Sequence, residues 1–318
     1  LKNLVILEKL GNNYDRTNSN IKVSTYISTL LMLSREEIER VKRTAELCKA
    51  DLLTQMVGEF PSLQGIMGRG YAEWDGEEKP VAIAIAEHYM PRYATDNIPT
   101  SRIGAIVGLA DKFDTISSCF ALDLIPTGSQ DPYSLRRHTY GIIRIIEEHG
   151  FALDIKETLY TSLDLLPLFE QKTDSHYHPV ILDKLVPKIK DFFKDRLFQI
   201  NIERGYRYDL VNAVLNAGIG FDDIHNFSQR LKVVSHISQE KWWPDLVTVV
   251  ERTFNIGKKA NSSGSVNERI LTEPEERKLW DVYKENEEAI RKLIGEKKYE
   301  EASHTYCNSF AKPVHAFF

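Results

Sequence analysis

Apolar residues recur at intervals of three and four positions along almost the whole chain. This spacing places apolar side chains on one face of a helix, and it is the feature that most restricts the possible folds. Strict alternation of apolar and polar residues, which indicates strands, is confined to short pieces such as residues 4–7 and 23–27. The sequence therefore predicts an all-α protein.

Capping residues predict where several of these helices begin and end. Ser34 and Glu37 form a capping box, and the apolar stripe that follows predicts a helix running to about Glu59. Asp131 predicts the start of another helix, which ends at Gly150. Further helix starts are predicted at Pro80, at Thr100 or Ser101, at Pro244, and at Thr272 with Glu275.

An acidic stretch divides the chain into two sets of helices. We expect a helical domain over residues 1–165, a connector over 166–177, and a second helical domain over 178–318. Of the segments compared, only residues 178–262 carry more basic than acidic side chains, 13 against 10. If a polyanion binds, the second domain is the best-supported contact region.

Charge and cysteine content exclude several classes of protein. The chain has 41 basic and 46 acidic residues and a net charge of −5, so no overall positive field attracts nucleic acid or anionic lipid. Its three cysteines, Cys48, Cys119 and Cys307, are far apart and indicate neither a disulfide framework nor a zinc ribbon. No apolar run of membrane-spanning length and no secretory leader is present, so we expect a cytoplasmic protein. The first residue is Leu1 rather than methionine, which indicates a fragment of a longer chain.

Three residues on neighbouring predicted helices, Asp51, His88 and Asp111, are the best candidates for a polar cluster. Their order, with Asp111 in the context ADKFDTI, resembles the HD domain of metal-dependent phosphohydrolases. Such enzymes need imidazoles and carboxylates together to hold a divalent metal and activate water. The histidine expected before Asp51 is Ala50, so these are degenerate HD positions and we expect no metal. The competing interpretations are a retained metal phosphohydrolase and a scaffold in which His88 and Asp111 bond each other or a helix end.

Other signatures of catalysis are missing from the sequence. Asp111 and Asp114 share a helix face, but a structural pair is the better interpretation. Gly104 and Gly108 on the same helix favour close approach of a partner helix over phosphate binding. There is no P-loop and no nucleophile elbow, so we assign no catalytic residue and expect no cofactor on this chain.

Basic residues mixed with aromatic ones are candidates for contact with RNA, which is bound through phosphate neutralisation and base stacking. The helix that begins near Asp131 carries one group on a single face, although Glu147 and Glu148 could neutralise Arg144 as ordinary surface pairs. A second group lies in the predicted second domain, where a lysine pair at a helix end also suits the helix dipole. The candidates are Arg136, Arg137, Tyr140, Arg144, Arg204, Arg207, Arg230, Lys232, Arg252, Lys258 and Lys259.

Several segments together resemble the beta subunit of the bacterial two-subunit glycyl-tRNA synthetase. The residues that carry this resemblance are 8–16, 48–72, 87–92, 103–116, 125–137, 205–215 and 251–260, and residues 272–318 are similar to the start of the helical anticodon-binding domain. The chain would correspond to the C-terminal part of that subunit, incomplete at its own C-terminus. The Ala50 departure agrees with this resemblance and counts against the hydrolase.

The resemblance implies a division of labour between two subunits. The alpha subunit would activate glycine with ATP and Mg²⁺ and transfer it to tRNA, while this chain recognises tRNA(Gly) through a degenerate HD-like domain and an anticodon-binding domain. It further implies a cytoplasmic α2β2 assembly with no membrane and no DNA partner. The role expected of this chain is to position tRNA for chemistry performed elsewhere. A third hypothesis is a helical adaptor that only joins subunits.

Overall fold

The computed structural model describes residues 1, 12–166, 177–218, 220–258 and 266–318. Helices are the only extended regular elements in these ranges, accompanied by two isolated bridges, Thr127 with Gln130 and Asp154 with Asp223. The prediction of an all-α fold is confirmed. Residues 23–27, which alternate like a strand, lie inside a helix, so that expectation was wrong. None of the helices described is long and apolar enough to cross a membrane.

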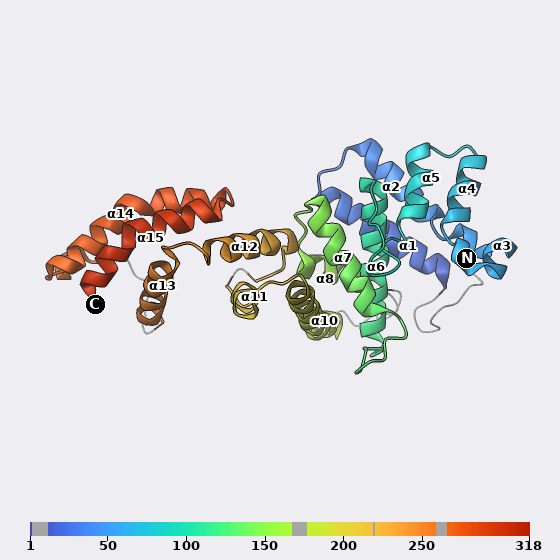
Figure 1. Cartoon of the computed structure of the whole chain (residues 1–318). Coiled ribbons are helices and arrows are strands. Elements are labelled where there is room, and N and C mark those ends of the chain that lie inside the picture. Colours follow the sequence, from blue (N-terminus) through green and yellow to red (C-terminus); the bar gives the residue numbers. More distant parts are fainter. Residues whose placement is uncertain (2–11, 167–176, 219, 259–265) are drawn as a thin grey trace. The chain divides into compact units, whose positions relative to one another are not determined.

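The chain forms two compact units, Leu1–Ser228 and Gln229–Phe318. Figure 1 labels their helices in chain order. The elements of the first unit are α1 (Asn13–Leu30), α2 (Arg35–Leu47), η2 (Ala50–Leu53), α3 (Gln55–Glu59), η3 (Pro61–Leu63), α4 (Ile66–Trp74), α5 (Lys79–Glu87), α6 (Arg102–Ala121), α7 (Leu135–His149), α8 (Ile155–Asp164), α10 (Tyr177–Glu203) and α11 (Tyr208–Leu215). Helix α12 (Ile224–Ile237) contains the division, and the second unit continues with α13 (Trp243–Gly257), η4 (Glu268–Ile270), α14 (Pro274–Gly295) and α15 (Tyr299–Phe317).

Helix α6 is the centre of the first unit, where α1, α2, α5, α7 and α8 pack against it (Figure 1). Sixteen of its 20 residues are buried, which requires small residues where a neighbour comes close. A Cβ added at Gly108 would lie 2.9 Å from the backbone oxygen of His88, and one at Gly104 would lie 2.7 Å from the Glu87 carboxylate. The predicted close approach at these two glycines is therefore confirmed.

The predicted helix starts agree with the structure more often than the predicted ends. Ser34 and Glu37 form the expected capping box, but α2 ends at Leu47 rather than near Glu59. The chain turns there into a 3₁₀ segment, and the hydroxyl of Thr54 then caps a separate short helix. The carboxylate of Asp131 accepts bonds from the first backbone N–H groups of α7, as expected of a cap, but the helix itself begins four residues later, at Leu135.

Helix α10, which was expected in a second domain, packs on α6, α7 and α8 of the first unit. The rings of Phe193 and Phe113 lie 6.2 Å apart, and those of Phe192 and Phe120 lie 5.6 Å apart. Packing divides the chain between Ser228 and Gln229, well after the predicted connector. Residues 167–176 of that connector lie outside the described residues, so its role as a boundary stays a prediction.

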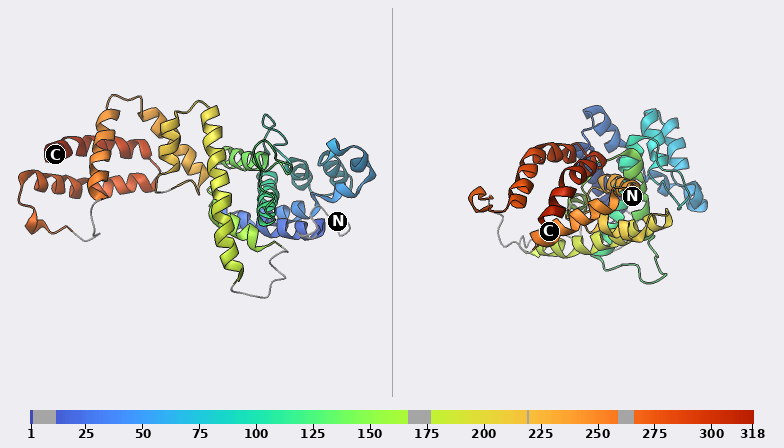
Figure 2. Two further views of the ribbon diagram at one scale, coloured as in Figure 1. Left: turned by 90° about the horizontal axis from the view of Figure 1, so that it is seen from below. Right: turned by 60° about the vertical axis from the view of Figure 1, so that its left-hand side comes forward.

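In the second unit, α14 and α15 form a helical hairpin whose two helices run side by side (Figures 1 and 2). A core of Val249, Phe310 and Val314 joins α13 to α15 and to the apolar face of α14. The start of α14 is capped by Glu273 with Glu276, one residue later than the predicted Thr272 with Glu275.

Candidate functional site

Asp51 is buried, with 2% of its surface exposed, and its carboxylate holds the turn that leads into α4. One carboxylate oxygen, Oδ2, accepts bonds from the backbone N–H groups of Gly65 at 2.6 Å and Gly68 at 3.2 Å. These N–H groups have no partner inside α4 because they lie at its start. Asp51 therefore stabilises the beginning of a helix, a role the sequence analysis did not assign to it.

His88 is fully buried at the end of α5. Its Nδ1 lies 2.6 Å from the backbone oxygen of Ile85, so this nitrogen carries the proton and donates it. Burial, together with the nearby Lys49 ammonium, holds the pKa of His88 well below its usual value. The imidazole is therefore neutral at pH 7. Its Nε2 has no hydrogen-bond partner among the described residues.

Asp111 forms an ion pair with a cation that the sequence analysis did not consider. The Nζ atom of Lys49, which lies between α2 and η2, is 3.1 Å from Asp111 Oδ2 and 4.1 Å from the centre of the Tyr89 ring. Burial opposes ionisation of Asp111, but the surrounding cations, Lys49 above all and also Arg16 and Lys112, together outweigh it and hold the pKa of Asp111 far below its usual value. Asp111 is a permanent anion with its own internal counterion.

A second lysine, Lys112, is 3% exposed and joins α5 to α6. Its ammonium donates to the backbone oxygens of His88 at 3.1 Å and Gly108 at 3.3 Å. Burial lowers its pKa to about 8, so it still carries a charge at pH 7. In the sequence, Lys112 directly follows Asp111 and Lys49 precedes Asp51 by two positions, but this spacing does not reveal that Lys49 pairs with Asp111.

The three degenerate HD positions therefore do not converge on one point. Asp51 bonds to the start of α4, His88 to the end of α5, and Asp111 to Lys49. In the part of the chain that the structure describes, no group of three or more His, Cys, Asp or Glu side chains is arranged to hold a metal ion. The donor set also fits a metal poorly, since an ammonium already neutralises Asp111. The expected bond between His88 and Asp111 is not formed, and His88 bonds to the last turn of its own helix rather than to a neighbouring helix end.

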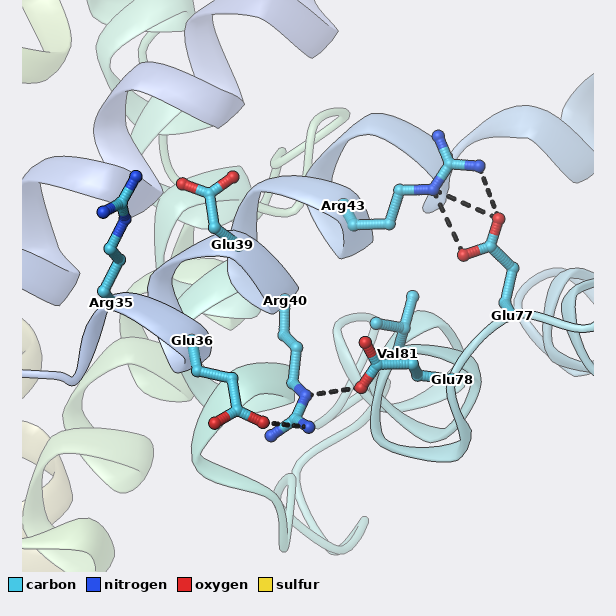
Figure 3. Close-up of a pocket in the computed structure, with 8 residues that line it drawn as sticks. All are labelled: Arg35, Glu36, Glu39, Arg40, Arg43, Glu77, Glu78 and Val81. Carbon is cyan, nitrogen blue, oxygen red and sulfur yellow. Dashed lines mark hydrogen bonds and ion pairs between the residues drawn. The ribbon is translucent and has the colours of Figure 1, made fainter.

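A surface hollow of about 650 Å³ lies beside α2 (Figure 3). Its lining is almost entirely charged, and ion pairs cross it. Arg43 forms a pair with Glu77, and Arg40 forms pairs with Glu36 and Glu78. The pairs with Glu77 and Glu78 connect α2 to the segment that leads into α5, while the pair with Glu36 lies within α2. The hollow is therefore best explained as a network of ion pairs that joins two elements.

On α7, three of the predicted RNA-contacting residues contact neighbouring groups. Arg136 donates to the backbone oxygen of Gly128 at 2.6 Å. Arg144 donates to two backbone oxygens of the segment before α6 and lies 5.6 Å from the ring centre of Tyr140. Arg137 is exposed and has no ion pair or hydrogen bond to the described residues.

The proposed neutralisation of Arg144 by Glu147 was wrong. Glu147 instead forms a bidentate ion pair with Arg204, with N–O distances of 3.0 and 2.8 Å. The loop before α6 lies against α7, so its backbone oxygens accept the hydrogen bonds that Arg144 donates. Arg207 also forms an ion pair, with Asp209 at 2.6 Å.

The basic candidates farther along the chain differ in accessibility. Arg230 is only 8% exposed, and Arg252 lies 3.0 Å from the Nδ1 atom of His315. Lys232 and Lys258 are exposed without an ion pair to the residues described. Lys259 lies outside those residues. Arg137, Lys232 and Lys258 are therefore the predicted cations whose charge is most available to a ligand.

Comparison with known proteins identifies the family. A family model described as glycyl-tRNA synthetase beta subunit matches residues 1–216. The glycine–tRNA ligase beta subunit of Halalkalibacterium halodurans is 36% identical over 318 residues, which is 100% of this chain and 45% of that protein. The subunit of Clostridioides difficile is 37% identical over 94% of this chain and 42% of its own length, and that of Geobacter sp. is 41% identical over 81% and 36%. This chain thus spans less than half of the length of these relatives, and it belongs to the glycyl-tRNA synthetase beta subunit family.

Proposed function

We propose that this chain recognises tRNA(Gly) as part of the beta subunit of a glycine–tRNA ligase. The observation that carries the proposal is the alignment of all 318 residues with a relative that bears this name. The ligase would act in the cytoplasm as an assembly of two alpha and two beta subunits. Its partners would be the alpha subunit and tRNA(Gly), with no DNA and no membrane.

Catalysis is placed on the alpha subunit, which would use ATP and Mg²⁺ to activate glycine. The bonding of the degenerate HD positions supports this division. Asp51 and Asp111 already have internal partners, and His88 is fully buried. These bonds within the fold favour a structural role for all three side chains.

The role of the chain would be to hold tRNA so that its acceptor end reaches the other subunit. Contacts made at a distance lower the entropic cost of bringing two reactants together. The exposed cations Arg137, Lys232 and Lys258 are suited to this task because phosphate contacts supply most of the affinity for nucleic acids and are sequence-independent.

The test is the affinity of the chain for tRNA(Gly), measured by fluorescence anisotropy at several salt concentrations. We expect affinity to fall as salt rises, and Lys258→Ala to lower the slope of log affinity against log salt by about one. Arg207→Ala is the matched control, because Asp209 already neutralises Arg207.

Binding that does not change with salt would argue against phosphate recognition. Binding to an alpha subunit without any affinity for tRNA would support the adaptor hypothesis instead.

A further inference from the structure

A cavity of about 260 Å³ lies in the first unit between α1, α6 and the start of α7. Arg16 of α1, Lys49, Tyr89 and Asp111 of α6 contribute to its walls. Its volume is below the range of about 300–1,000 Å³ that is typical of sites for drug-sized ligands. Any occupant is therefore a small molecule.

The cavity walls carry buried polar atoms that have no hydrogen-bond partner among the described residues. They are the amide nitrogen of Asn13, the amide oxygen of Asn20, the hydroxyl of Tyr89 and Nδ1 of His138. Asn13 and Asn20 are only 3% and 4% exposed. Buried polar groups are nearly always bonded to protein or to an ordered molecule. Four such atoms on residues that line one cavity therefore favour polar contents, either water or a polar ligand.

Two cations also reach this cavity with unused donors. Lys49 donates to Asp111, which occupies one of the three protons of its ammonium. Arg16 donates through Nε to Asp114 and through one terminal nitrogen to Thr115. A guanidinium has five N–H donors, so both cations retain donors for another acceptor.

The charges of the lining favour an anion. Its charged lining groups are the two cations Arg16 and Lys49 and the carboxylate Asp111, and Arg16 also pairs with the buried Asp114 at 3.0 Å. Burial lowers the pKa of His138 to about 4, so this imidazole is neutral at pH 7. The charged Lys112, which interacts with Asp111 and Lys49, adds to the positive potential. A second cation would be repelled here, and an apolar molecule would leave the polar walls without partners.

We propose that this cavity binds one small oxyanion, a phosphate or carboxylate group carried by a metabolite-sized molecule. Its charge contacts Lys49 and Arg16, and its remaining polar atoms bond to Asn13 and Asn20. The site is separate from the exposed cations proposed to contact tRNA, and it does not depend on that function. A ligand of this kind would link the packing of α1 against α6 to the concentration of a small anion.

Isothermal titration calorimetry of the 318-residue chain tests the proposal with inorganic phosphate and, separately, with acetate. Chloride keeps the ionic strength constant. We expect saturable binding of at least one probe at one site per chain, and the probe that binds identifies the oxyanion. Asn20→Asp keeps the shape of the side chain but adds a negative charge to the wall, so we expect it to weaken binding at least tenfold. Arg40→Gln, which removes a cation outside the cavity, should leave affinity unchanged.

Absence of binding by both probes to the folded chain would overturn the proposal, as would equal affinities of wild type and Asn20→Asp. A measurement on the wild type makes the test independent of how the variant folds. In nuclear magnetic resonance spectra, the side-chain amide signals of Asn13 and Asn20 should shift as the probe saturates the site. Signals that do not move would also refute the assignment.

Discussion

Replacing Gly108 by alanine tests whether α5 and α6 approach so closely that only glycine fits. The added Cβ would lie 2.9 Å from the backbone oxygen of His88 and 3.4 Å from its Cα. Ordinary contacts between carbon and a carbonyl oxygen are about 3.3–3.6 Å, so the helices must separate by roughly 0.5 Å. The contact is with backbone, which has no side-chain rotamer through which to move away.

The magnitude follows from three contributions. Alanine gains up to about 1 kcal/mol over glycine inside a helix. Overpacking of a buried contact costs about 1–3 kcal/mol. Separation of the helices also weakens the bond from the Lys112 ammonium to His88, which is worth about 1 kcal/mol or more. We therefore expect Gly108→Ala to lower the free energy of unfolding by about 1–3 kcal/mol.

Gly70→Ala is the matched control, because a Cβ at this helical glycine meets no atom within 4 Å. It should raise stability by up to about 1 kcal/mol through helix propensity alone. The assay is denaturation in urea, with unfolding monitored by hydrogen exchange in peptides from the first unit. Peptides of that unit are used because a chain of two units need not unfold in one step. If Gly108→Ala unfolds at the same urea concentration as Gly70→Ala, or at a higher one, the inferred close contact is wrong.

Three further substitutions probe the same unit. Asp51→Asn replaces the carboxyl acceptor by a weaker amide, so the amide protons of Gly65 and Gly68 should exchange faster and stability should fall by about 1–2 kcal/mol. Unchanged exchange would contradict the helix-start role. His138 has a folded pKa of about 4 against about 6.5 when unfolded, so its stabilising contribution is complete above pH 6.5 and is lost as pH falls toward 4. His138→Gln should therefore flatten the loss of stability between pH 6.5 and 4.5, measured by thermal denaturation, and an unchanged slope would count against a buried neutral imidazole. Arg43→Ala removes an exposed pair with Glu77 and should cost less than about 1 kcal/mol, with a still smaller effect in 1 M salt; a larger loss would mean that the network of Figure 3 is more than a surface contact.

The sequence by itself determined the fold class and many helix starts, because these depend on residues three or four positions apart. The box of Ser34 with Glu37, the cap at Ser101 and the left-handed Gly150 after α7 are all such local signals. The two glycines of α6 also indicated a close helix contact correctly. The family was identified from segments of sequence and confirmed by comparison.

Only the tertiary structure decided which polar groups are bonded to one another. Lys49 pairs with Asp111 across 62 positions of sequence, and Arg204 pairs with Glu147 across 57, so no local spacing records either contact. Local spacing likewise does not record where α2 ends or that α10 packs on the first unit. A side chain's partner is the group that folding brings within about 3 Å, and this depends on how distant helices pack rather than on neighbouring residues.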